Sequence, residues 1–302
     1  MVHIETKMKK PRLLITGASG FLGTHLCRTA AARYTVLGVS NKNKIAVNNV
    51  KVLSVDLCDR KALKKFFIQV KPDVVIHAAA MSVPNLCQQY PSESNKINVS
   101  ASLHIAEFCC NQAIPMAFVS TDLVFDGCKG NYSESDTVSP VSLYGEQKVN
   151  AEAGISDLLP NSVICRMPLM FGDVIGSSQS FIQPMIYSFN TAVKQNLFTD
   201  EFRSPVSARS ASHGILLALE KTTGIIHLGG KERVSRYDFG VMLAEVGNFD
   251  KRLIVPKLQK EIKFTAPRPP DVSLNSSKAF SLGYSPDNIR DALSKLSCIS
   301  VK

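Results

Sequence analysis

The feature that most constrains this fold is a regular alternation of short apolar segments with helical segments over residues 12–122. Runs of Val, Ile and Leu read as buried strands, and the segments between them carry apolar residues at helical spacing. The expected strands are 12–16, 34–40, 50–57, 73–80 and 115–122, and the expected helices are 21–33, 60–70 and 96–112. This alternation predicts an α/β fold, a doubly wound parallel sheet with helices on both faces.

The second half of the chain adds fewer regular elements. Two more strands are expected at 162–172 and 224–230, and a helix within 234–247 should begin at Ser235, three residues before Asp238. Segments 173–223 and 251–302 carry more Pro, Ser and short mixed elements. We therefore expect a smaller lobe that is interleaved with the sheet.

Composition narrows the classes of function. The formal net charge is +10, but Lys and Arg are spread along the chain, with no basic block beyond KMKKPR (7–12). This pattern favours a solvated basic surface that attracts a phosphorylated ligand over a nucleic-acid-binding protein. The eight cysteines form no CxxC pair and no zinc-type cluster with histidine, so no metal site is expected.

Nothing in the sequence suggests a membrane protein. No run of 18 or more apolar residues occurs, and the polar N-terminus lacks the apolar segment of a signal peptide. We expect a cytoplasmic protein, with a targeting segment trimmed from this sequence as the alternative.

A glycine triplet follows the first strand and opens the first helix: Gly17, Gly20 and Gly23, spaced GxxGxxG. Glycines allow a tight turn and close approach of a pyrophosphate, and the helix N-terminus offers N–H groups to it. The alternative is a glycine turn without a ligand, which the strand–turn–helix context disfavours. The loop residues expected at a dinucleotide cofactor also include Ser19, Phe21 and Leu22.

The end of the second strand bears on the choice of cofactor. An NAD-binding chain usually carries an acidic residue there, to bind the ribose 2′-OH. This chain has Ser40, Asn41 and Lys42 instead, which suit a 2′-phosphate. We therefore predict NADP(H), with the alternative that another group selects the cofactor. After the fourth strand, Ala78, Ala79 and Ala80 are small where a cofactor must pass.

Polar residues that suit proton transfer follow the fifth strand. Ser120, Thr121 and Asp122 end that strand, where ligands bind in such sheets. Tyr144 and Lys148 lie one turn apart at the start of a helix. A Thr hydroxyl could hold a substrate carbonyl, the Tyr could donate a proton, and the Lys cation would lower the pKa of the Tyr.

The spacing GxxGxxG resembles the extended branch of the short-chain dehydrogenase/reductase superfamily, which has a Rossmann fold. The resemblance implies that Asp56 and Leu57 contact adenine and that Lys148 also binds the nicotinamide ribose. Asn98 falls where the superfamily often has a proton-relay asparagine, and an ordinary asparagine on a helix face is an equal alternative.

STDLVFDG (120–127) and SPVSLYGEQKVNAE (139–152) are similar to motifs of the dTDP-4-dehydrorhamnose reductase family. The resemblance covers most of the chain and implies that Thr121, Tyr144 and Lys148 are catalytic. It extends to ICRMPLMFG (164–172), EFRSPVSARSAS (201–212) and APRPPDVSLNSSKAFSLG (266–283). The further residues implied at the cofactor or substrate are Arg166, Met167, Pro168, Asp122, Val124, Arg203 and Arg268, and Arg166 could equally be a structural ion-pair partner.

The chain departs from the family pattern in several places. Leu123 replaces a Tyr, Ala151 replaces a Gly before Glu152, residues 167–170 lack a Trp, and Asn275 replaces an Asp. The departures move the sequence toward a sister group, the regulatory beta subunit of methionine adenosyltransferase, which binds NADP and acts as a partner subunit.

Two functions from different classes are therefore expected. The first is NADPH-dependent reduction of a keto group on a nucleotide-linked deoxysugar, with a nucleotide-sugar-like substrate. The alternative is an NADP-binding regulatory subunit, and a nucleotide-sugar epimerase or dehydratase ranks third. We expect a Rossmann NADP-binding domain at 1–172 with 224–247, a substrate-binding lobe at 173–223 and 248–302, and either a homodimer or a regulatory partner enzyme.

Overall fold

The centre of the molecule is a parallel sheet of seven strands, in the order β11-β6-β5-β4-β1-β2-β3. The computed structural model describes residues 10–41, 47, 50–176 and 178–299. The sheet strands are β1 (Arg12–Thr16), β2 (Thr35–Ser40), β3 (Val50–Ser54), β4 (Val74–His77), β5 (Met116–Thr121), β6 (Val163–Met167) and β11 (Gly224–His227). The predicted doubly wound α/β fold is confirmed. The strand order reverses between β1 and β4, where such sheets form a ligand-binding crevice.

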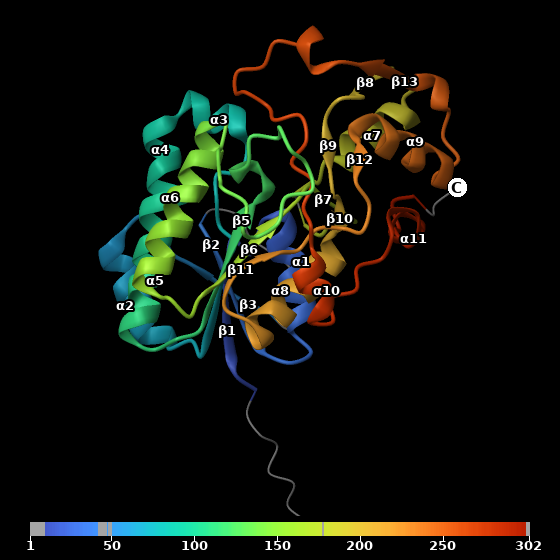
Figure 1. Cartoon of the computed structure of the whole chain (residues 1–302). Helices are drawn as coiled ribbons and strands as arrows, with labels where there is room; N and C mark the ends of the chain where they lie inside the picture. Colours follow the sequence, from blue (N-terminus) through green and yellow to red (C-terminus); the bar gives the residue numbers. More distant parts are fainter. Residues whose placement is uncertain (1–9, 42–46, 48–49, 177, 300–302) are drawn as a thin grey trace, which may run out of the picture.

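Helices cover both faces of this sheet (Figure 1). Successive residues of β1 point to opposite faces, so Ile15 packs into one core and Leu14 into the other. Helices α1 and α8 pack together over the Ile15 side, whereas α2, α5 and α6 cover the Leu14 side. Their bounds are α1 (Phe21–Ala30), α8 (Ala208–Lys221), α2 (Arg60–Val70), α5 (Ala101–Asn111) and α6 (Leu143–Leu158).

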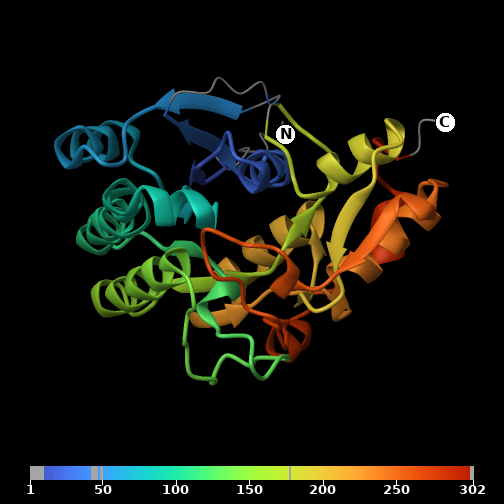
Figure 2. The same ribbon diagram turned by 90° about the horizontal axis from the view of Figure 1, so that it is seen from above.

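A smaller lobe with its own apolar core lies beside the sheet and its helix layers (Figure 2). Phe171, Phe239 and Leu243 are buried at its centre. Its elements are β7 (Met170–Phe171), α7 (Ile182–Asn190), β8 (Gln195–Phe198), β9 (Phe202–Arg203), β10 (Val206–Ser207), β12 (Val234–Ser235), α9 (Arg236–Val246), β13 (Ile254–Lys257) and α11 (Ile289–Ser294). The short helix α10 (Ser277–Ser281) packs instead at β11, with Ala279 in the core that contains Ile15. The domain limits given above stay a prediction.

Several local elements differ from the sequence-based expectation. The expected strand 162–172 is interrupted at Pro168, which lacks an N–H for the ladder, and β7 pairs with β10 instead. The expected helix 96–112 begins with a π-helical turn, η1 (Lys96–Ser100). Before it lie two short helices that the sequence analysis did not assign, α3 (Pro84–Gln89) and α4 (Pro91–Asn95), each opened by a proline.

One predicted helix start is confirmed in detail. The Ser235 hydroxyl accepts a hydrogen bond from the Asp238 N–H, and the Asp238 carboxylate reaches back to Ser235, which together form a capping box. The remaining helical elements are short 3-10 turns: η2 (Asp122–Val124), η3 (Lys251–Leu253) and η4 (Gln259–Glu261).

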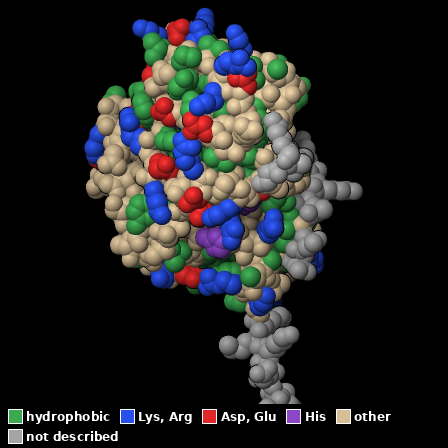
Figure 3. Space-filling view, turned by 90° about the vertical axis from the view of Figure 1, so that its right-hand side faces the viewer, with side chains coloured by type: hydrophobic (Ala, Val, Ile, Leu, Met, Phe, Trp, Pro, Cys, Tyr) green, Lys and Arg blue, Asp and Glu red, His purple; other side chains and the backbone are tan. Residues whose placement is uncertain are grey.

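The surface carries mixed charge. On the face shown in Figure 3, Lys and Arg side chains lie among acidic and uncharged ones and do not form a continuous stripe. Within the described part of the chain, none of the helices has the length and apolar character needed to cross a lipid bilayer.

Candidate functional site

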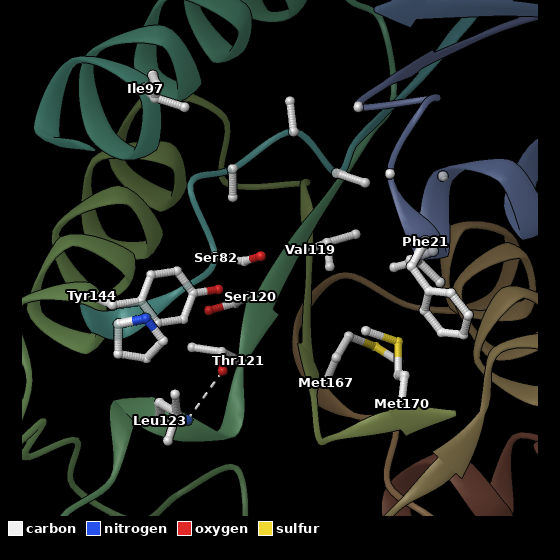
Figure 4. A pocket seen from close by; sticks show the side chains of 18 of the residues that line it. Phe21, Ser82, Ile97, Val119, Ser120, Thr121, Leu123, Tyr144, Met167 and Met170 are labelled. Carbon is white, nitrogen blue, oxygen red and sulfur yellow. Dashed lines mark hydrogen bonds between the residues drawn. The ribbon is translucent and has the colours of Figure 1, made fainter. Parts of the chain in front are cut away.

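A cavity of about 660 Å³ lies at the carboxyl ends of the central strands. Its walls come from the glycine turn after β1, the ends of β2 to β6, the start of α6, and loops of the smaller lobe (Figure 4). In that view Tyr144, Ser120 and Thr121 lie on one side, and Phe21 and Met167 lie on the other. The cavity therefore joins the glycine turn to the proposed catalytic residues.

The glycine turn is built for close approach of the backbone. Gly17 has φ +67°, and a Cβ atom there would lie 2.7 Å from the backbone of Ala79. Gly20 precedes α1 and provides no side-chain cap for it. The first N–H groups of α1 therefore have no side-chain acceptor at the cap, and an anion at this point would satisfy them.

Most residues predicted for the cofactor lie on this cavity. Those lining it are Gly17, Ser19, Gly20, Phe21, Leu22, Gly23, Ser40, Asn41, Asp56, Leu57, Ala78, Ala79, Ala80, Ser120, Tyr144, Met167 and Pro168. Lys42 lies outside the described residues. The turn after β1, the end of β2 and the end of β4 thus form one continuous surface.

Thr121 and Tyr144 reach the cavity from two neighbouring elements. Thr121 ends β5, and its hydroxyl accepts a hydrogen bond from the Leu123 N–H at 3.2 Å. Ser142 caps α6, which brings Tyr144 into the first turn of that helix. The Tyr144 side chain points toward Ser120 and Thr121 in Figure 4.

Lys148 lies behind the cavity wall. It is 1% exposed, and its ammonium group donates a hydrogen bond to the Val119 carbonyl at 2.7 Å. The ammonium nitrogen is 3.8 Å from the centre of the Phe118 ring. Burial lowers the pKa of Lys148 to about 7, and the negative charge of Glu152 acts in the opposite direction.

The pKa of Tyr144 is raised in this structure. Burial is the main cause, and the charges of Asp122 and Cys87 act in the same direction, while the hydrogen bond with Thr121 lowers it. The expected lowering by Lys148 is therefore not what the structure shows. A raised pKa keeps the Tyr144 hydroxyl protonated, which suits a proton donor.

The far end of the cavity carries a charged cluster. Arg203 lies 3.6 Å from the Asp122 carboxylate and 3.5 Å from that of Glu201, and Arg268 lies 3.7 Å from Glu201. One carboxylate oxygen of Asp122 and one of Glu201 are buried without a hydrogen-bond partner. Burial raises the pKa of Asp122 to about 6, against the lowering effect of Arg203. Such a cluster can accept hydrogen bonds from hydroxyls and donate to phosphate oxygens.

Besides Lys148, three predicted residues do not line the cavity. Val124 is buried in a separate apolar cluster with Phe125. Arg166 forms an ion pair with Glu152 at 2.7 Å, which is the structural alternative stated above. Asn98 is fully buried, and its side chain binds the backbone of Met81.

Other lining residues were not predicted. They include Ser82, Ile97, Val119, Leu123, Leu169, Met170, Gln179, Ser180, Glu201, Pro267 and Pro269. Glu201 and the two prolines adjoin predicted arginines in the sequence, so proximity in the chain was a usable signal. Gln179 and Ser180 had none, because their approach depends on how the smaller lobe packs. Among the described residues, no group of three or more His, Cys, Asp or Glu side chains could hold a metal ion.

Solved structures of similar shape support the resemblance to the dTDP-4-dehydrorhamnose reductases. A structure described as a hypothetical dTDP-4-dehydrorhamnose reductase from Sulfolobus tokodaii is 33% identical, with a TM-score of 0.80 over 92% of this chain and 98% of that one. The dTDP-4-dehydrorhamnose reductase of Bacillus anthracis in complex with NADP has a TM-score of 0.84 over 95% and 98% of the two chains. At 19% identity, the second match shows the fold alone.

The curated relatives include a regulatory-type subunit and a reductase. Methionine adenosyltransferase 2 subunit beta of Xenopus laevis is 27% identical over 291 residues, which cover 94% of this chain and 86% of the relative. "Probable low-salt glycan biosynthesis reductase Agl14" of Haloferax volcanii is 28% identical over 291 residues, or 93% and 96% of the two chains. The model of the RmlD substrate binding domain matches residues 11–298, nearly the whole chain, and this protein therefore belongs to the RmlD substrate binding domain family.

Proposed function

We propose that this protein is an NADPH-dependent reductase of a keto group on a nucleotide-linked deoxysugar. The observation that carries the proposal is the single cavity shared by the glycine turn, by Thr121 and Tyr144, and by the Arg203 and Arg268 cluster. These three parts would serve the cofactor, the reacting carbonyl and the phosphorylated substrate, respectively. The similarity to a hypothetical dTDP-4-dehydrorhamnose reductase at 33% identity agrees with this assignment.

The residues present fit a nicotinamide dinucleotide. The glycine turn leaves no room for a Cβ at Gly17 and lines the cavity beside the first turn of α1. Ser40 and Asn41 line the cavity at the end of β2, where an acidic residue would repel a 2′-phosphate. This composition favours NADP(H) over NAD(H).

The cofactor, when bound in its reduced form, would supply the hydride. The protein's own residues would position the carbonyl and supply the proton. The Thr121 hydroxyl would hold the carbonyl oxygen, and Tyr144, whose raised pKa keeps it protonated, would donate its proton to the developing alkoxide. Hydride and proton together convert the ketone into an alcohol and leave a tyrosinate, which is reprotonated from solvent. A cationic Lys148, one turn along α6, would stabilise that tyrosinate.

The substrate side would use the charged cluster. Arg203 and Arg268 are donors for the oxygens of a diphosphate, and the carboxylates of Asp122 and Glu201, which these arginines face, are acceptors for sugar hydroxyls. A ligand that carries both groups, such as a nucleotide sugar, matches this mixture better than a simple ketone does.

The test is oxidation of NADPH by the purified protein with a dTDP-4-keto-6-deoxy sugar, measured beside a Tyr144→Phe variant. Turnover by the unchanged protein that is lost in Tyr144→Phe would support the proposed reductase activity. An absence of turnover with this substrate and with other nucleotide-linked keto sugars, while NADPH still binds, would contradict it.

A regulatory subunit is the second candidate. Two observations favour it: the 27% identity to methionine adenosyltransferase 2 subunit beta over 94% of this chain, and the position of Lys148, which donates to Val119 and does not line the cavity. This candidate predicts that NADPH binds without turnover. It also predicts that the protein co-purifies with a methionine adenosyltransferase from its own source and changes that enzyme's rate.

A further inference from the structure

One wall of the cavity is a segment of irregular backbone held by a buried side chain. Ala80 and Ser82 line the cavity, and Met81 lies between them. The Met81 N–H donates to the Asn98 side-chain oxygen at 2.8 Å, and the Met81 carbonyl accepts from the Asn98 amide nitrogen at 3.1 Å. The position of this wall therefore depends on where Asn98 is held.

Asn98 is held in turn by Gln147, a residue of α6. The Gln147 side-chain oxygen accepts a hydrogen bond from the Asn98 amide at 2.8 Å, and its own amide donates to the Ser94 hydroxyl at 2.8 Å. Gln147 is 2% exposed, so both bonds are screened from water. It precedes Lys148 directly and lies one turn after Tyr144, on the same buried face of α6.

Burying a glutamine side chain on this face of α6 requires desolvation of its amide, which has a free-energy cost. An apolar side chain of similar size would fill the space, whereas a buried amide must find partners for its oxygen and its nitrogen. Here both are satisfied, by residues 49 and 53 positions away in the sequence. A fully satisfied buried network fixes one relative placement of the parts that it joins. The parts joined are the cavity wall at Met81 and the helix that carries Tyr144. The hydrogen bonds that join them, from Met81 through Asn98 to Gln147, are here called the clasp.

We propose that Gln147 is a positioning residue that sets the gap between Tyr144 and the wall at residues 80–82. The inference rests on the proposed reductase function for its kinetic readout. Gln147 does not line the cavity and acts through Asn98 and through α6. Asn98 holds Met81, and the next residue, Ser82, lies on the Tyr144 side of the cavity in Figure 4. Loss of these hydrogen bonds should therefore affect the rate of the chemical step more than the affinity for NADPH.

The first test is Gln147→Met, which keeps the volume and removes both polar atoms. Misplacement of a catalytic group by about 1 Å can lower a rate about 100-fold, so we expect kcat to fall between about 10- and 100-fold. The Kd for NADPH, measured by fluorescence, should stay close to that of the unchanged protein. The Gln147→Glu variant keeps the oxygen that accepts from Asn98 and should recover part of the lost rate.

Ile155→Val is the matched control. Ile155 is fully buried on the same helix, two turns beyond Gln147, and contributes to the apolar core. Ile155→Val lowers the stability of the fold but leaves the clasp intact. Thermal melts compare its loss of stability with that of Gln147→Met. If Gln147→Met slows turnover no more than Ile155→Val, or if Gln147→Glu is as slow as Gln147→Met, the proposal is overturned.

Hydrogen exchange gives a readout that needs no substrate. Gln147→Met should speed exchange of the amides of residues 78–84, and Ile155→Val should not. If the unchanged protein turns over no keto sugar, the proposed function fails, and exchange alone decides the role of Gln147. Equal exchange in all three proteins would overturn the clasp and leave the reductase proposal untouched.

Discussion

At the scale of single residues, the buried charges behind the cavity are linked to one another. Glu152 lies one turn after Lys148 on α6 and accepts hydrogen bonds from Ser120 and Arg166. Its charge raises the pKa of Lys148, whereas burial lowers it. The ionisation of Lys148 at neutral pH thus depends on a carboxylate that does not touch the cavity.

Tyr144→Phe tests the proton donor. The change removes one oxygen and keeps the ring, so the cavity wall stays in place. Loss of a positioned acid costs between about 100- and 10,000-fold in rate, and we expect a fall of that size in NADPH oxidation. Binding of NADPH, followed by fluorescence titration, should hardly change. Weak NADPH binding by the variant would point to a structural role for Tyr144 instead.

Glu152→Gln tests the electrostatic link through pH. The pKa of Lys148 is already lowered to about 7 by burial, and removal of the Glu152 charge should lower it further. The cation is then lost at a lower pH, so the alkaline limb of the kcat profile should move to lower pH.

Arg166→Met is the control for the Glu152 experiment. It breaks the same ion pair but keeps the carboxylate, so its alkaline limb should not move to lower pH. An identical shift in both variants would mean that the ion pair matters as a structural unit and that the charge on Glu152 does not set the pKa of Lys148.

At the scale of elements, the glycine turn between β1 and α1 combines two constraints. Gly17 has a left-handed backbone, and its missing Cβ makes room for the loop after β4. The same residue thus sets the turn and lets two strand ends approach each other.

A comparison of Gly17→Ala with Gly224→Ala separates the effect of positive φ from the effect of the close approach of the Ala79 backbone. Both glycines have positive φ, +67° and +72°, but an added Cβ meets the Ala79 backbone at 2.7 Å only in the first case and finds open space in the second. In each variant the alanine must adopt a left-handed conformation, which should lower the free energy of unfolding by about 1–2 kcal/mol.

Gly17→Ala should in addition weaken NADPH binding by more than about tenfold, since one hydrogen bond to a charged group is worth about 1.5–3 kcal/mol. Isothermal titration measures the affinity, and thermal melts measure stability. Equal NADPH affinity in the two variants would contradict the role of close approach at Gly17.

Elements with local signals were predictable from the sequence. The strands of the sheet, the helix 60–70 and the Ser235 cap each depend on periodicity or capping within a few residues. The break at Pro168 was also readable, because a proline in an interior strand argues against its continuation. By contrast, the two-residue strands of the smaller lobe depend on partners far along the chain, as in the pairing of β7 with β10.

The residues of the candidate site likewise divide into those that a sequence motif indicated and those whose position depends on packing. Motifs indicated Gly17, Thr121 and Tyr144, which all line the cavity. The position of Lys148 was not predictable, because its ammonium group binds a carbonyl on β5, and that contact depends on how α6 packs on the sheet. Gln147 lies within the motif 139–152, but the motif indicated no role for it, because its partners lie on α4 and η1.

At the scale of the whole molecule, a late segment of the chain joins the smaller lobe to the first half. The stretch 258–270, here called the strap, leaves β13 and passes beside α3 (Figure 1). Its side toward the smaller lobe is fixed by the edge-to-face contact of Phe264 with Phe198 and by a hydrogen bond from the Gln259 N–H to Asp200. The strap then lines the cavity with residues 267–269.

The tie between the strap and α3 is a hydrogen bond from the Ala266 N–H to the Asn85 side-chain oxygen at 3.1 Å. Asn85→Ala removes that acceptor, and a hydrogen bond contributes about 1 kcal/mol net. We expect the KM for the sugar nucleotide to rise about fivefold, the equivalent of that energy, because residues 267–269 become less ordered. The Kd for NADPH should not change.

Asn288→Ala is the matched control for the strap, because Asn288 caps α11 with a hydrogen bond from the Asp291 N–H at 2.8 Å. It should lower stability by a similar amount and leave KM unchanged. Hydrogen exchange at residues 262–266 should quicken in Asn85→Ala alone. If KM and exchange are the same in both variants, the strap is held by its contacts within the smaller lobe. Its hydrogen bond to α3 would then have no effect on substrate binding.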